Sequence, residues 1–328
     1  MTFAAYATSS LADDSSVVVK KTIAAALVIV LTLVHTSSRR RSGGLQAMFT
    51  VFKVAVILGF CVSALLFADD LQPVKLLPQV GDIEVLTGSA FAISLIYVSY
   101  AYTGWNAATY LSSELEDPQR NLPRILFIGT ATVAMLYVAL NYVFLRVAPM
   151  DAMSGQLEVG YIAAEFAFGE WGGRFAGLAL ALLLVSTVSA MTIAGPRVMQ
   201  VVGEDFSPLR RLAATNADGL PYVAIMAQSA LTLLFIVTGS FESILVFAGF
   251  TLALNSFVTV AGVFRMGDMP RPYRSFAYPV TPMIYLLIMG WTLAFVLFSR
   301  PTEALFGIAL MVSGIVIYWL ASRENARD

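Results

Sequence analysis

Long apolar stretches separated by short polar segments run along the whole of this 328-residue chain. About 20 consecutive apolar residues form a helix long enough to cross the ~30 Å hydrocarbon core of a bilayer. The pattern therefore predicts about nine transmembrane helices, near residues 21–37, 44–67, 87–114, 123–146, 173–201, 221–238, 242–264, 278–298 and 303–321. The opening stretch, Thr2 to Ala12, is too short to span, and it is either the stub of a further helix or a surface segment.

Composition supports this all-α polytopic membrane protein, because 58% of the residues are hydrophobic and only 12% are charged. Soluble domains usually contain about 25% charged residues. The formal net charge of −1 argues against a nucleic-acid partner. One cysteine, Cys61, excludes an intrachain disulfide, and one histidine, His35, excludes a His-rich metal site. We expect neither a metal nor a cofactor.

The positions of Lys and Arg indicate the orientation, because cytoplasmic loops carry an excess of these residues. If the loop from Arg39 to Arg41 is cytoplasmic, alternation of the spans puts most of the 20 Lys and Arg residues on that side. The C-terminus is then cytoplasmic, and we expect a multi-pass protein of the plasma (inner) membrane. The longest connections, 68–86 and 147–172, then lie outside. The second either holds short helices that act as a lid or is an ordinary connecting loop.

A polar segment that contains a glycine interrupts the third predicted span, from Tyr100 to Asn106. A break at mid-membrane depth is costly unless it lines a cavity, and transporters use such breaks to hold substrates. Unwinding is expected at Thr103 and Gly104, and Asn106 stands where a second half-helix would restart and be capped. Exposed carbonyls there attract an ammonium group, and exposed amides attract a carboxylate. An α-amino acid carries both of these groups. The alternative is a continuous helix in which Gly104 permits close packing.

Lys53 lies about ten residues into the span that begins near Gly44, so it is about 14 Å deep at 1.5 Å per residue. A lysine at that depth costs at least ~2.5 kcal/mol and usually marks an ion or proton pathway. The alternative is a fixed structural cation bonded to backbone carbonyls. Hydroxyls at Ser186, Ser189 and Thr192 share one helical face. They either line a pathway and interact with Lys53, or they mediate helix packing.

Three common catalytic and phosphate-binding motifs are absent from the sequence. It contains no HExxH, no GxSxG and no phosphate-binding GxxxxGK[ST]. We therefore expect no enzymatic activity.

The interrupted span and its flanks resemble a known family, the amino acid–polyamine–organocation (APC) superfamily, close to its L-type amino acid transporter branch. Tyr100 to Asn106, followed by Ser113 to Pro118 and Arg120 to Arg124, resembles the sixth helix of that family and the loop after it. Three further segments resemble the fifth helix, the end of the eighth and the entry to the eleventh: Gln46 to Leu58, Gly195 to Asp205, and Arg271 to Pro282.

The resemblance implies a leucine-transporter-type fold of inverted repeats, with substrate held at the breaks of the first and sixth helices. It assigns the sixth-helix side of the substrate site to Tyr100, Ala101, Tyr102, Thr103 and Gly104, with Tyr100 as an aromatic gate. Lys53 matches the fifth-helix lysine that takes the place of a sodium ion in sodium-independent members. Thr187 matches a hydroxyl position of the eighth helix near that lysine. Asn106 joins Lys53 and Thr187 as a residue of coupling or gating.

Two departures from the family pattern stand out. Thr103 occupies a position where relatives often have glycine or another small residue, so we expect a smaller or differently shaped pocket. The first two helices and most of the third have no counterpart, so we expect residues 1–328 to form one transporter domain that corresponds to helices four to twelve and is incomplete at its N-terminus. The segment from Leu11 to Lys20 has no cysteine, so we expect no disulfide-linked subunit.

The resemblance therefore implies a permease for amino acids or related amines that works by alternating access in the lipid bilayer. Sodium-independent transport is expected, as either a proton-coupled symporter or an exchanging antiporter, with protons as the candidate coupling ion. The alternative is a truncated membrane remnant or scaffold that does not transport.

Overall fold

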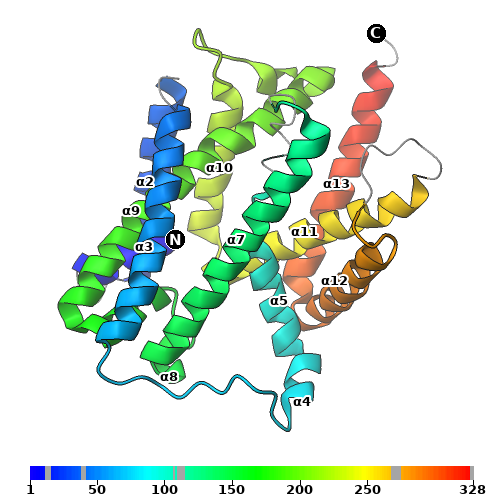
Figure 1. Cartoon of the computed structure of the whole chain (residues 1–328). Coiled ribbons are helices and arrows are strands. Elements are labelled where there is room, and N and C mark those ends of the chain that lie inside the picture. The colour runs from blue at the N-terminus through cyan, green and yellow to red at the C-terminus, as the bar shows by residue number, and fades with distance from the viewer. Residues whose placement is uncertain (12–15, 38–41, 106–107, 109–114, 267–274, 326–328) are drawn as a thin grey trace. The chain divides into compact units, whose positions relative to one another are not determined.

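The computed structural model describes residues 1–11, 16–37, 42–105, 108, 115–266 and 275–325, and all of the regular elements in these ranges are helices. Two compact units share the chain: Met1–Leu76 with Thr132–Thr238, and Leu77–Ala131 with Gly239–Asp328. Seven of the described helices are long and apolar enough to cross a membrane. Ser89–Ala101 and Tyr222–Thr238 are shorter apolar helices. The all-helical, multi-span architecture predicted from the apolar stretches is confirmed (Figure 1).

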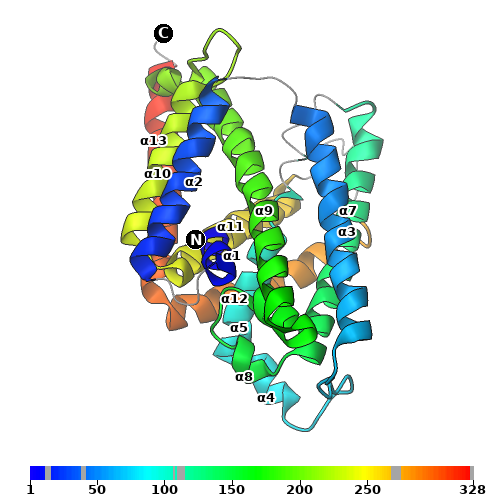
Figure 2. The same ribbon diagram turned by 90° about the vertical axis from the view of Figure 1, so that its left-hand side faces the viewer.

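The first unit contains seven complete helical elements and the C-terminal part of α7 (Pro118–Val147). The complete elements are α1 (Thr2–Leu11), α2 (Val17–Ser37), α3 (Ser42–Phe67), α8 (Met150–Met153), α9 (Val159–Asp205), the 3-10 helix η2 (Ser207–Ala213) and α10 (Tyr222–Thr238). Helix α2 packs along α10, and the two lie side by side in both Figure 1 and Figure 2. Helix α9 contacts α1, α2, α3 and α10, so it is the central element of this unit.

The opening stretch of the chain is a packed helix and not a surface segment. In α1, Ala4 and Ala5 are buried. The Gly160 backbone N–H donates to the Tyr6 hydroxyl over 3.1 Å, and the Ser9 hydroxyl donates to the Glu158 carboxylate over 3.0 Å. Helix α1 is therefore attached to the first turn of α9 by both packing and polar contacts.

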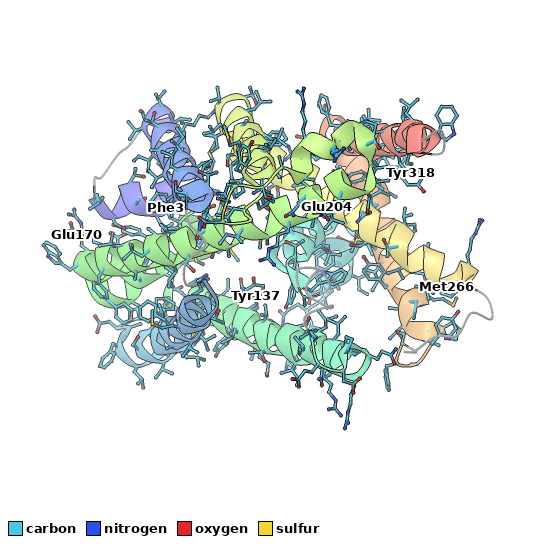
Figure 3. The ribbon with its side chains drawn as sticks, turned by 90° about the horizontal axis from the view of Figure 1, so that it is seen from above. Phe3, Tyr137, Glu170, Glu204, Met266 and Tyr318 are labelled. Atoms are coloured by element: carbon cyan, nitrogen blue, oxygen red, sulfur yellow. The ribbon has the colours of Figure 1, made fainter. Side chains whose placement is uncertain are left out.

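Helix α9 is longer than the predicted span 173–201, because it begins at Val159 and ends at Asp205. It bends at Gly169, which has φ 74° and ψ −178°, a conformation that only glycine adopts readily. The stretch before this bend, together with α8, makes much of the connection 147–172 helical. Seen from above, α9 runs from the region of Glu170 to that of Glu204, with Phe3 of α1 alongside (Figure 3).

One apolar core of the first unit joins α3, α7 and α9. Its buried members include Cys61 and Ala64 of α3, Val143 and Val147 of α7, and Ala163 and Ala167 of α9. Small residues dominate the α9 side, and they let membrane helices approach closely.

The second unit contains α4 (Asp82–Thr87), α5 (Ser89–Ala101), α11 (Phe241–Gly262), the 3-10 helix η3 (Val263–Arg265), α12 (Val280–Ser299) and α13 (Pro301–Asn325), with the first part of α7. Helix α11 contacts α5, α12 and α13. A core of Ile96, Val246, Phe250, Leu293, Val296 and Ala304 joins these four helices. Within the predicted span 87–114, helix α5 ends at Ala101, which is where the sequence predicts the break, and most of residues 106–114 lie outside the described residues.

Candidate functional site

Helix α5 ends where the sequence indicates a break. Its last hydrogen bonds run from the Tyr102 N–H to the Val98 carbonyl (3.1 Å) and from the Thr103 N–H to the Tyr100 carbonyl (3.0 Å). Gly104 then has φ +111°, a left-handed conformation that side chains disfavour. The backbone therefore leaves the helical path at Thr103 and Gly104, and the alternative of a continuous helix is wrong.

Thr103 closes the end of α5 with its side chain, because its hydroxyl donates to the Tyr100 carbonyl over 2.6 Å. The C-terminal end of a helix carries a partial negative charge, because its last carbonyls point out of the helix. Such an end suits a cation of the size of an ammonium group. Tyr100 itself is 38% exposed, so it is only partly covered by its neighbours.

The last turns of α5 are held against α11 by a glycine contact. A Cβ atom placed on Gly249 would lie 2.6 Å from Cγ2 of Ile96 and 3.7 Å from Cβ of Tyr100. Only a residue without a side chain permits this approach of the two helices. Gly249 is thus a determinant of where Tyr100 lies, and it was missed from sequence because glycine is common at membrane helix contacts of every kind.

Lys53 and Thr187 meet in the first unit. The Lys53 Nζ donates to the Thr187 Oγ1 over 2.9 Å, which joins the middle of α3 to α9. The Thr187 hydroxyl also contacts the Leu183 carbonyl of its own helix over 3.3 Å. The lysine is half-buried, and its charge is directed at a hydroxyl of a neighbouring helix.

The other hydroxyls of α9 have different surroundings. Ser189 is hydrogen-bonded to Nε2 of His35 on α2 over 2.8 Å, so it mediates helix packing. Thr192 donates to the Val188 carbonyl of its own helix. Ser186 is buried, with no hydrogen-bond partner among the described residues. Sequence reasoning did not pair His35 with Ser189, because the two lie 154 residues apart on different helices.

Asn106, the expected cap of a restarted helix, lies outside the described residues. Within the described part of the chain, no three His, Cys, Asp or Glu side chains gather in a way that could hold a metal ion. The residues from Tyr100 to Gly104 belong to the second unit, whereas Lys53 and Thr187 belong to the first.

The apolar helices and the broken helix α5 define a multi-pass helical membrane protein with an interrupted helix of the kind that transporters use. The chain belongs to the amino acid permease family, which matches residues 1–322. The predicted membership of the APC superfamily, near its L-type branch, is confirmed by this match and by the relatives.

Three relatives illustrate the similarity. The human large neutral amino acids transporter small subunit 2 is 32% identical over 247 residues, which are 70% of this chain and 43% of the relative. The mouse b(0,+)-type amino acid transporter 1 is 25% identical over 292 residues, 84% of this chain and 57% of the relative. The mouse Asc-type amino acid transporter 1 is 26% identical over 247 residues, 70% of this chain and 44% of the relative. The chain thus spans about half the length of these relatives, whose names describe transporters and not enzymes.

Proposed function

We propose that this chain provides the transport machinery of a permease for amino acids or related amines, working by alternating access. The observation that supports this proposal most directly is the end of α5 at Ala101, which is followed by Gly104 in a left-handed backbone conformation. Membership of the amino acid permease family and the names of the relatives agree with this proposal.

In this proposal, the segment from Tyr100 to Gly104 forms one side of the substrate site. The carbonyl end of α5 receives the substrate ammonium group, because the helix dipole places partial negative charge there. The partly exposed ring of Tyr100 covers the substrate as a gate. Asn106 is proposed to cap the helix that follows, although its position lies outside the described residues.

Lys53 and Thr187 are proposed as the coupling site. The ammonium group of Lys53 donates a hydrogen bond to a hydroxyl of a neighbouring membrane helix, and the family resemblance puts this lysine in the place of a sodium ion. Transport is therefore proposed to be independent of sodium, and driven by protons or by exchange. Protonation and deprotonation of Lys53 would strengthen and weaken the contact to Thr187, because a hydrogen bond from a charged donor is the stronger one.

The membrane in which the chain lies, the side of its C-terminus and its subunit composition are also proposals. The distribution of Lys and Arg in the sequence supports a plasma (inner) membrane protein with a cytoplasmic C-terminus. The lack of cysteine between Leu11 and Lys20 supports a transporter without a disulfide-linked subunit. We further propose that the chain acts as a single transporter domain corresponding to helices four to twelve of the family.

Uptake into proteoliposomes tests the proposal. The purified chain is reconstituted, and uptake of radiolabelled leucine is measured with a pH gradient, with a sodium gradient and with unlabelled leucine inside the vesicles. Uptake that responds to the pH gradient or to internal leucine, but not to sodium, is expected. Absence of leucine binding and uptake by the chain would contradict the proposal and favour a membrane scaffold.

A further inference from the structure

A polar cluster in the second unit joins three elements around the side chain of Glu242. Glu242 lies in the first turn of α11, and its carboxylate lies close to the Tyr97 hydroxyl on α5. The same carboxylate accepts from the guanidinium group of Arg300, in the turn between α12 and α13. Figure 1 shows α5, α11 and α12 packed together in this unit. No part of the proposed transport mechanism uses this cluster.

The cluster lies next to the proposed substrate segment in the chain. Tyr97 precedes Tyr100 by three residues, which is nearly one helical turn. Glu242 and Gly249 are seven residues apart on α11, so they lie on the same face of that helix. Helix α11 therefore meets the end of α5 at two levels: Glu242 lies close to Tyr97, and Gly249 contacts Ile96 and Tyr100.

Stability alone does not account for the cluster. The side chains of Arg300 and Glu242 are 38% and 54% exposed, and exposed ion pairs contribute little to folding. Their geometry has a clearer consequence, because the hydrogen bond from Arg300 orients the Glu242 carboxylate. A neighbouring contact, from the Ser243 hydroxyl to the Glu303 carboxylate over 3.1 Å, joins the same turn of α11 to α13.

We propose that Tyr97, Glu242 and Gly249 are positioning residues that set where the Tyr100–Gly104 segment lies and thereby set substrate affinity. The inference rests on the proposed function. Tyr97 and Glu242 act by restraining the last turns of α5, with Arg300 orienting the carboxylate, and Gly249 acts by permitting close contact with α11.

Hydrogen exchange tests the restraint without any transport measurement. Backbone amide exchange over residues 98–105 is measured for the purified protein and for Tyr97→Phe, Glu242→Ala and Gly249→Ala. Each variant is expected to exchange roughly tenfold faster in this segment, because local opening there loses a restraint. Glu170→Ala is the matched control, since it removes another exposed ion pair, with Arg174 over 2.8 Å in the first unit. Exchange unchanged in all three variants would overturn the proposal.

Leucine transport then tests the link to affinity. Tyr97→Phe and Glu242→Ala are each expected to raise KM roughly three- to tenfold with Vmax within about twofold. The double variant is expected to match the single ones, because both substitutions remove the same contact. Faster exchange with unchanged KM would overturn the effect on affinity. If the wild-type chain neither binds nor transports leucine, the proposed function fails, while the exchange result still decides whether these residues restrain α5.

Discussion

Lys53 and Thr187 lie 134 residues apart in the sequence, and their side chains are joined by a hydrogen bond of 2.9 Å from Nζ to Oγ1. The contact connects the middle of α3 with α9. An intramembrane lysine needs such a partner, because an ammonium group without one is costly in an apolar environment. The pair is therefore the natural starting point for mutational tests.

Removing the hydroxyl of this pair should impair transport. Thr187→Val keeps the shape of the side chain but takes away the acceptor for Lys53, so we expect leucine uptake to fall by roughly tenfold, in line with a lost hydrogen bond to a charged group. Thr187→Ser keeps the hydroxyl and should stay within about twofold of the wild type. Equal uptake by the Val and Ser variants would show that the hydroxyl has no role.

Removing the charge should affect coupling as well as rate. Lys53→Ala is expected to abolish uptake or to leave uptake that no longer depends on external pH, measured from pH 5 to 8 in proteoliposomes. Lys21→Ala is the matched control, because the Lys21 amine also donates to an oxygen of another helix, the Val237 carbonyl, over 2.9 Å. Wild-type transport with an unchanged pH dependence in Lys53→Ala would contradict the coupling role.

The left-handed glycine of the break should not tolerate a side chain. Gly104→Ala places a Cβ at φ +111°, which should destabilise this backbone conformation by about 1–3 kcal/mol. We expect weaker leucine binding in a scintillation proximity assay. Gly129→Ala is the control, because it lies in helix α7 and a Cβ there meets no atom within 4 Å. Unchanged affinity in Gly104→Ala would show that the break does not need this conformation.

A side chain at the bend of α9 should likewise destabilise the protein. Gly169 has φ 74° and ψ −178°, so Gly169→Ala should destabilise the protein by about 1–3 kcal/mol. The expected readout is a lower midpoint of thermal unfolding in detergent. Gly59→Ala in α3, where a Cβ meets open space, should leave the midpoint unchanged or raise it. A midpoint unaffected by Gly169→Ala would mean that the bend does not require glycine.

Much of the helix arrangement along the chain could be predicted, because apolar length is a strong signal in membrane proteins. The spans near 21–37, 44–67 and 221–238 correspond closely to α2, α3 and α10. Element ends were harder to predict. Helix α9 begins at Val159 and not near residue 173, because Gly169, Gly172 and Gly173 lie inside it and the polar residues Glu165 and Glu170 lower the hydropathy of its first part.

The sequence by itself determined the membrane class, the family and the break at Thr103 and Gly104, since each depends on residues that are close together in the chain. Only the tertiary structure decided which distant side chains meet: Thr187 with Lys53, Ser189 with His35, and Glu242 with Arg300. The physical reason is that helix periodicity shows which residues share a face, whereas the partner of that face depends on how the helices pack.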